Sequence, residues 1–377
     1  MKGLPVSVVK GFFRPSLRSL SITCGKDLSV PTLLSLLSTT SLLEELSISP
    51  PKNRTIPRMN NPRTKAQEVS LPRLSTLKLS SDVVDSGILL DHLVLPSTTS
   101  YNIQLGDEPA EFMLALERKL QGIKTIRCGQ LSARSLCDYM LVWKAWATDV
   151  SFEEESPPKD TPLVCIRMLF QHTKFNPGAV SIFSNLALSK LEKLQVANAW
   201  RLIPCESWDF LFALTPQLED LSLIGPPPAL GPVLQALRVT AKPAEYQTIV
   251  LSKLRTVSVG FGTGLTQVNE VEQFAKDLGS ILKSRITFGS KLLRLVVGGI
   301  PGLLSTRRLR PLEKLVDGIT LIALNDPDSF SWDSASESDG PFESDGESDS
   351  ELETDGELDP EFESDGESEL QSESESD

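Results

Sequence analysis

The sequence repeats a short motif, Leu-x-x-Leu-x-Leu or Val, and this repeat limits how the chain can bury its apolar residues. Three regular copies occupy residues 191–196, 218–223 and 234–239. In an extended strand the last two apolar residues of a copy point to one face, and the residue between them points to the other. Because one strand cannot cover its own apolar face, several copies must stack side by side around a shared core.

The same spacing recurs elsewhere, with substitutions, at residues 17–22, 43–48, 74–79, 90–95, 123–128, 254–259 and 292–297. A nearly continuous apolar run at 163–170 predicts one more strand, packed on both sides. Between the strands we expect helices at about 31–37, 107–120, 132–143, 207–214 and 269–282. In the last of these, Asn269 is expected to cap the helix and Glu272 to complete a capping box.

Charge divides the sequence into two unlike parts. The chain carries 37 Lys and Arg and 50 Asp and Glu, for a net charge of −13. No Lys or Arg follows Lys314, whereas residues 326–377 hold 22 acidic residues, so the body carries about +9. Dense like charge with few apolar residues prevents burial. We therefore predict an α/β solenoid over residues 1–324, with a parallel sheet and helices on the outer face, and a disordered acidic tail over 325–377.

Several functional classes are not expected. The five cysteines are scattered and lack a C-x-x-C pair, which argues against a disulfide framework or a zinc site and favours the cytoplasm or nucleus. No apolar run is long enough to span a membrane, and no signal-peptide pattern is present. His92 and His172 lack partners at catalytic spacing, and the glycines at 260, 262 and 264 depart from a dinucleotide loop. We expect no catalytic residues, cofactor or metal.

The residues between the leucines are the candidate functional positions. Outward strand positions are expected to line one surface, which either binds a protein partner or is merely solvated. Its excess of Lys and Arg suits an acidic protein segment, with nucleic acid as the alternative. The predicted positions are Thr76, Lys78, Thr125, Arg127, Lys193, Gln195, Asp220, Ser222, Ala236, Arg238, Thr256, Ser258, Arg294 and Val296, of which Lys78, Arg127, Lys193, Gln195, Asp220, Arg238 and Arg294 are the candidate partner-binding residues.

The acidic tail has a repeat of its own. Phe342, Leu352 and Phe362 each open a Glu-Ser/Thr-Asp-Gly-Glu segment, at intervals of ten residues. The hydroxyl residues in these segments have an acidic residue three places on, and resemble acceptor sites of acidophilic kinases of the casein-kinase-two type. They are Ser344, Thr354 and Ser364; the alternative is an unmodified solubilising tail.

The repeat resembles the leucine-rich repeat over most of residues 15–300. More narrowly, the runs at 71–79 and 90–96, with the acidic tail, resemble basidiomycete fungal F-box proteins that carry degenerate repeats. In that family an N-terminal F-box binds the adaptor of a cullin-based ubiquitin ligase, and the repeats present the substrate. Only sixteen residues precede Leu17, too few for a three-helix F-box, so we do not expect this chain to bind the adaptor.

Together these features predict a non-catalytic protein-interaction scaffold, and the resemblance implies the substrate-recognising part of an F-box-type ligase receptor that lacks its F-box. The alternative is a chromatin-associated or nucleic-acid-associated factor in which the acidic tail competes for the basic body. We expect no membrane partner.

Overall fold

The computed structural model of the chain describes residues 11, 13–23, 29–50, 67–81, 86–105, 110–120, 123, 126–134, 139–148, 150, 162–170, 183, 186, 188–199, 203, 205–238, 251–261, 267–299 and 306–323. The chain divides into two units, Met1–Trp332 and Asp333–Asp377, and every described residue belongs to the first. The predicted disordered tail at 325–377 lies outside the described residues.

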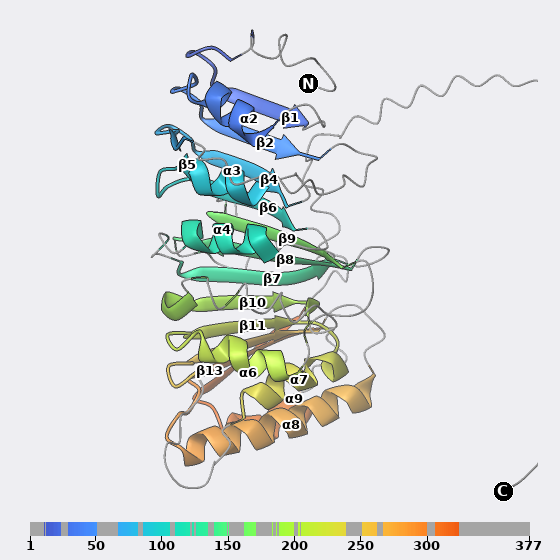
Figure 1. The fold of residues 1–377 in the computed structure, drawn as a ribbon. Helices are drawn as coiled ribbons and strands as arrows, with labels where there is room; N and C mark the ends of the chain where they lie inside the picture. Colours follow the sequence, from blue (N-terminus) through green and yellow to red (C-terminus); the bar gives the residue numbers. More distant parts are fainter. Residues whose placement is uncertain are drawn as a thin grey trace, which may run out of the picture. The chain divides into compact units, whose positions relative to one another are not determined.

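A twelve-stranded, mostly parallel sheet organises the first unit (Figure 1). Every neighbouring pair is parallel except those made by β8, which runs antiparallel to β7 and β9. Two further strands, β3 (Val69–Ser70) and β5 (Leu93–Val94), form a separate small sheet. In spatial order the twelve strands are β1 (Ser19–Thr23), β2 (Glu45–Ser49), β4 (Thr76–Ser80), β6 (Ser100–Leu105), β9 (Val164–Phe170), β8 (Tyr139–Trp146), β7 (Cys128–Arg134), β10 (Lys193–Ala197), β11 (Asp220–Ile224), β12 (Thr256–Gly260), β13 (Arg294–Gly299) and β14 (Gly318–Ala323).

Helices cover one face of this sheet (Figure 1). Inward strand residues such as Leu194 and Leu221 share one apolar core with helix residues such as Leu34, Leu116 and Phe274. The described helices are α2 (Val30–Leu37), α3 (Ser86–His92), α4 (Ala110–Leu120), α6 (Cys205–Ala213), α7 (Gly231–Ala236), α8 (Val268–Thr287) and α9 (Thr306–Glu313), with short 3₁₀ turns η1 (Leu188–Lys190) and η3 (Pro227–Leu230). The prediction of an α/β protein with a parallel sheet is therefore confirmed.

The repeated motif produces a repeated backbone geometry. The carbonyl of Glu192 accepts the N–H groups of Glu219 (2.8 Å) and Asp220 (3.0 Å), and the carbonyl of Glu219 accepts those of Arg255 (2.8 Å) and Thr256 (3.0 Å). The carbonyls of Arg18, Glu44, Arg127 and Arg255 make the same double contact with the next strand. Each clear copy of the motif thus enters the sheet in the same register, and its leucines stack into continuous rows.

Three predicted copies differ from the structure. Residues 234–239 were expected to form a strand, but residues 234–236 belong to α7, and Val233, Leu234 and Leu237 are buried at helical spacing. Residue 239 lies outside the described residues. Residues 90–95 divide between the end of α3 and the two-residue β5. The copy at 123–128 is displaced by three residues, because Cys128 pairs with Lys193 and is therefore the first strand residue. β14 adds a copy that sequence reasoning missed, beginning at Val316.

The predicted helix at 132–143 is wrong. Its described residues, 132–134 and 139–143, form the end of β7 and the first part of β8, which pair as antiparallel strands. Leu141 and Trp143 point to the helix-covered side, while Val142 lies on the other side and is also buried. Burial on both faces removes the period-two alternation that normally marks a strand, so the apolar run looked helical.

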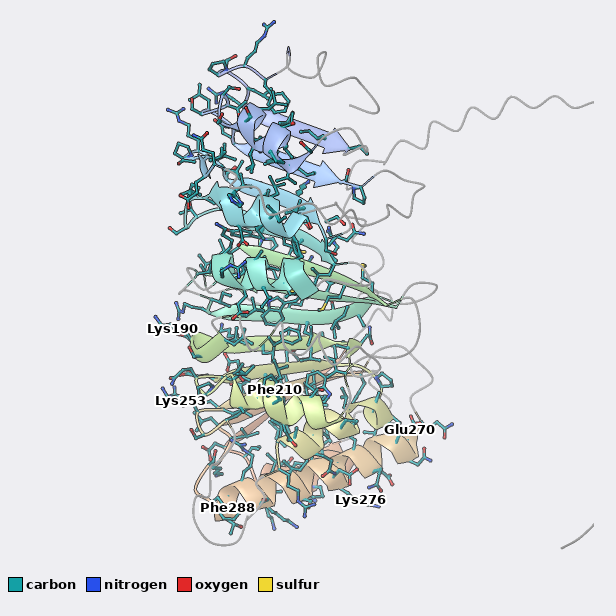
Figure 2. All side chains as sticks on the ribbon, viewed as in Figure 1. Lys190, Phe210, Lys253, Glu270, Lys276 and Phe288 are labelled. Atoms are coloured by element: carbon teal, nitrogen blue, oxygen red, sulfur yellow. The ribbon has the colours of Figure 1, made fainter. Side chains whose placement is uncertain are left out.

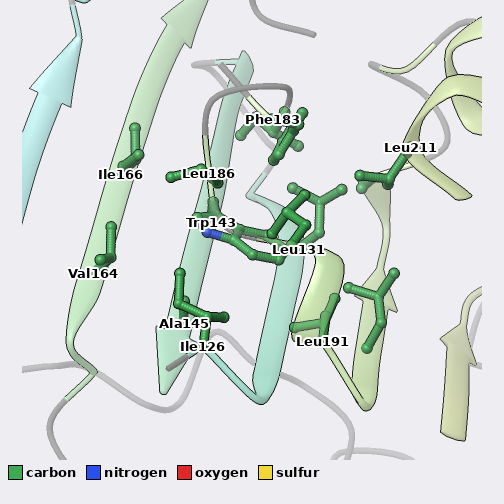
Figure 3. Close-up of a cluster of buried hydrophobic side chains, with 14 of the residues drawn as sticks. Ile126, Leu131, Trp143, Ala145, Val164, Ile166, Phe183, Leu186, Leu191 and Leu211 are labelled. Carbon is green, nitrogen blue, oxygen red and sulfur yellow. The ribbon is translucent and has the colours of Figure 1, made fainter. Parts of the chain in front are cut away.

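Trp143 fills the centre of this region (Figure 3). Its indole lies over Gly129 of the neighbouring strand, and a Cβ at Gly129 would come within 2.4 Å of Trp143 Cη2. The ring also meets Phe183 edge to face, with centroids 5.5 Å apart. The missing side chain at residue 129 therefore makes the space that the Trp143 indole occupies.

Most of the expected helices are confirmed. α2 has Pro31 in its first turn, and the predicted face of α4, Phe112, Leu116 and Leu120, is buried. The predicted cap of α8 is wrong by two residues: Gln267, not Asn269, is the N-cap, and the carboxylate of Glu270, not of Glu272, accepts the Gln267 N–H at 3.0 Å. α3 and α4 are tied together because Lys119 donates to the carbonyls of Asp91 (3.1 Å) and Leu93 (2.7 Å), and burial lowers the pKa of that lysine.

Candidate binding surface on the sheet

The sheet face opposite the helices carries the outward side chains of every strand. Two rows cross the sheet in register and contain most of the predicted positions. One row joins Lys193, Asp220, Thr256 and Arg294, the first residues of β10 to β13. The row two residues further on runs from Lys78 on β4 through Asn102, Cys165, Lys144, Gln130, Gln195, Ser222 and Ser258 to Val296 and Thr320.

The middle of this face is closed. Gln195 has 0% exposure and Gln130 has 4%, and Gln130 Nε2 donates to Gln195 Oε1 at 2.6 Å. Beside them Cys128, Trp146 and Val150 form a small second core, in which the Val150 N–H donates to Cys128 Sγ at 3.4 Å. The prediction that Gln195 lies on an open partner-binding surface is therefore wrong. Val296, at 6% exposure, was also expected on that surface and is buried.

Two open strips flank the closed middle. The N-terminal strip comprises the outward residues of β1, β2, β4 and β6, including Lys78, which is exposed. The C-terminal strip comprises those of β11 to β14 other than the buried Ile224 and Val296; here Asp220 is half-buried and Arg294 is exposed. Arg294 Nε donates to Thr320 Oγ1 at 3.4 Å, and Lys193 stands half-buried at the border of this strip.

Arg127 and Arg238 do not lie on this face. Arg127 precedes β7 and pairs with Glu192, its Nη2 lying 2.5 Å from Oε2. Arg18 with Glu44 (3.0 Å) and Arg255 with Glu219 (3.7 Å) repeat this pair one residue ahead of other strands. Such exposed pairs contribute less than about 1 kcal/mol each. Arg238 is exposed in the turn after α7, and Ala236 is buried within that helix. Thr125 lies outside the described residues.

The turns that precede the parallel strands lie together along one side of the sheet, the side where these strands begin, here called an edge. Figure 2 labels Lys190, before β10, and Lys253, before β12, at this edge, and Phe288 near it at the end of α8. Glu270, at the start of α8, lies at the opposite edge (Figure 2). α8 therefore runs antiparallel to the strands and returns the chain to the edge where β13 starts.

The described side chains of the sheet face carry a net positive charge. Five are basic, Lys78, Lys144, Arg167, Lys193 and Arg294, and two are acidic, Glu45 and Asp220. Arg167 of β9 donates a hydrogen bond to Asn102 Oδ1 of the neighbouring β6 at 3.0 Å. Lys78 and Arg294 are the exposed basic residues of the two strips, and each strip also carries one acidic residue, Glu45 or Asp220.

The structure describes the other candidate sites only in part. His92 Nδ1 lies 2.8 Å from the Ile88 carbonyl one helical turn earlier, and His172 lies outside the described residues, as do Gly262 and Gly264. Among the described residues no group of three His, Cys, Asp or Glu side chains could hold a metal ion, and no described helix could cross a membrane. Ser344, Thr354 and Ser364 also fall outside the described part, so their phosphorylation stays a prediction.

Sequence reasoning did not anticipate a groove of about 210 Å³ between α7 and the first turns of α8. Leu234 and Phe274 are apolar lining residues, and Glu270 and Asp277 stand on the α8 side. Both carboxylates already accept hydrogen bonds, Glu270 from the Gln267 N–H and Asp277 from Gln273 Nε2 at 2.9 Å. Their arrangement fits a helix start and a helix-surface pair.

Comparison of the sequence with protein-family models and with curated proteins finds no match.

Proposed function

We propose that this protein is a non-catalytic interaction scaffold, a degenerate leucine-rich-repeat-type solenoid that binds an acidic protein segment across its sheet face. The observation that carries the proposal is the excess of basic side chains on that face, five against two acidic. Each open strip holds one basic and one acidic residue, and the half-buried Lys144, Arg167 and Lys193 between the strips supply the excess. The stacked motif and the repeated carbonyl contacts support the solenoid assignment.

The two strips make the proposal testable with single charge reversals. Lys78→Glu changes the N-terminal strip and Arg294→Glu the C-terminal strip; both side chains are exposed. Lys276→Glu and Lys283→Glu are matched controls, because these lysines are exposed on α8, away from the sheet face. A partner is first identified by affinity capture with the parent chain, then purified and titrated against each variant by calorimetry.

We expect at least one strip variant to bind the purified partner about tenfold more weakly than the controls, since a lost charge contact in an interface costs roughly 1.4 kcal/mol or more. Equal affinity of all four variants would contradict the assignment of the surface. Coupling to a ubiquitin ligase, which the sequence of this chain does not predict, would make the protein lower the cellular level of its partner. Depleting it should then raise that level, whereas a plain scaffold leaves the level unchanged.

The alternative is a nucleic-acid-associated factor with an autoinhibitory acidic tail, favoured by the same basic face and by the 22 acidic residues of 326–377. Binding of duplex DNA by the full chain and by a chain ending at residue 325, at 50 and 200 mM salt, separates the two. Tail competition requires stronger, salt-sensitive binding by the shorter chain. Absence of salt-dependent binding in both chains removes this alternative.

A further inference from the structure

The groove between α7 and α8 has two walls of helical spacing. Figure 1 shows α7 on the same side of the sheet as α8. The lining residues recur three or four positions apart on each wall, and include Pro228, Gly231 and Leu234 from η3 and α7, and Glu270, Gln273 and Asp277 from α8. Seven residues of an α-helix rise about 10 Å. The groove therefore follows α8 for two turns.

The size of the groove suits one or two side chains of a docked segment. Its volume is about 210 Å³, below the roughly 300–1,000 Å³ of small-molecule pockets. The apolar part of its lining is preformed, because Leu234 has 1% exposure and Phe274 has 3%. Phe274 also meets Phe261 edge to face, with ring centroids 5.2 Å apart. An apolar side chain can therefore dock against this lining without a rearrangement of the core, which lowers the cost of binding.

The α8 wall carries two carboxylates without a basic partner. Glu270 and Asp277 are half-buried, and no described Lys or Arg forms an ion pair with either. Glu192 and Glu219 are also half-buried, but each pairs with an arginine. The positive N-terminus of α8 offsets charge near Glu270 only, because the effect of the helix dipole falls off within the first turn. The groove therefore combines an apolar lining with unpaired negative charge.

We propose that this groove binds a basic amphipathic helix of a partner protein, laid along α8. Glu270 accepts the Gln267 N–H through Oε2 and Asp277 accepts Gln273 Nε2 through Oδ1, so each has a second oxygen for a Lys or Arg. Basic residues seven positions apart on a partner helix match the spacing of the two carboxylates. An apolar residue midway between them lies on the same face and meets Leu234 and Phe274. This inference does not rest on the acidic partner proposed for the sheet face.

A synthetic alanine-rich helical peptide, with lysines seven positions apart and a leucine midway, serves as the probe in calorimetric titrations of the full chain. Glu270→Gln with Asp277→Asn removes both charges and keeps both acceptors, because glutamine can complete a capping box and asparagine retains Oδ1. The matched control, Glu272→Gln with Glu313→Gln, removes two exposed carboxylates that do not line the groove. We expect the parent and the control to bind the peptide equally, and the groove variant to bind it about tenfold more weakly.

A steric variant tests the groove independently of its charge. A Cβ at Gly231 would meet nothing within 4 Å, so Gly231→Leu adds a side chain to the lining without a clash at Cβ. This variant should melt within about 2 °C of the parent and bind the peptide about tenfold more weakly. Equal affinity of the parent and the Glu270/Asp277 variant, or a parent that does not bind the peptide, would overturn the proposal. Equal binding of a peptide interrupted by proline would assign the groove to an extended basic segment and refute the helix.

Discussion

Replacing Gly129 by alanine should destabilise the fold more than its small size suggests. The added Cβ would lie 2.4 Å from Trp143 Cη2, more than 1 Å inside an ordinary carbon contact. Trp143 has 0% exposure and packs edge to face on Phe183, so its ring has no free space to move into. Overpacking of a well-packed core costs about 1–3 kcal/mol, and a clash with a rigid, wholly buried ring belongs at the upper end, about 2–3 kcal/mol.

The measurement is the free energy of unfolding in urea, for Gly129→Ala and for Gly231→Ala as the control. A Cβ at Gly231, the first residue of α7, would meet nothing within 4 Å, so that variant should stay within about 0.5 kcal/mol of the parent. Trp143→Phe removes the part of the indole that clashes. In that background Gly129→Ala should cost less than about 0.5 kcal/mol, because the two changes share one contact. A Gly129→Ala variant as stable as the parent, or an undiminished cost in the Trp143→Phe background, would refute the packing argument.

Two further predictions concern polar groups in and on the sheet. Burial raises the pKa of Tyr101 to about 12 from 10.0, so the folded state keeps this proton longer than the unfolded state does, and stability is lost as pH rises from 10 to 12. Between pH 9 and pH 11 the parent should therefore lose about 1 kcal/mol more than Tyr101→Phe in urea unfolding, and parallel losses would contradict the assignment. Gln130→Met or Gln195→Met alone leaves the other buried amide without its hydrogen-bond partner and should lower the free energy of unfolding by about 1–3 kcal/mol. The stability of the double variant should lie closer to that of the parent. Additive losses in the double variant would show that the 2.6 Å hydrogen bond is not the source of the cost.

The helix at 231–236 shows why the motif alone could not settle local structure. The first two leucines of the motif are three residues apart, and residues three apart also lie on one face of a helix. The spacing of Leu234 and Leu237 is therefore compatible with the motif's strand and with a helix. Pro232 in the first turn favours the helix. Which reading prevails depends on whether a neighbouring strand is available, and β11 already pairs with β12 on the side where a strand from this segment would lie.

The copy around Ile126 shows a second kind of ambiguity. Ile123 and Ile126 are three apart, as are the turn residue and the first motif leucine at Leu188 and Leu191. The structure aligns Ile126 with Leu191, which places Gly129 where the neighbouring strand has Leu194. The expected leucine is missing because Trp143, fourteen residues later, fills that volume. Thr125 and Arg127 were therefore predicted on the outward face, whereas Cys128 and Gln130 occupy it.

The candidate surface was also predictable from the sequence only in part. Alternation within each strand correctly separated Lys78, Lys193, Asp220 and Arg294 from the core, because the direction of a side chain in a strand depends only on residue parity. Alternation could not show that Gln195 is buried, since burial on the outward face of the sheet depends on segments distant in the sequence. Arg167 and Lys144 were missed because their strands, β9 and β8, do not carry the motif.

The sequence by itself determined the parallel sheet, the positions of its clear copies and the contrast between a basic body and an acidic tail, because spacing and composition are local properties. Tertiary structure decided the antiparallel β8 at the centre, the register of β7 and the division of the outward face into two open strips. These depend on which strand lies beside which and on how much volume its neighbours leave, and no window of sequence contains that information.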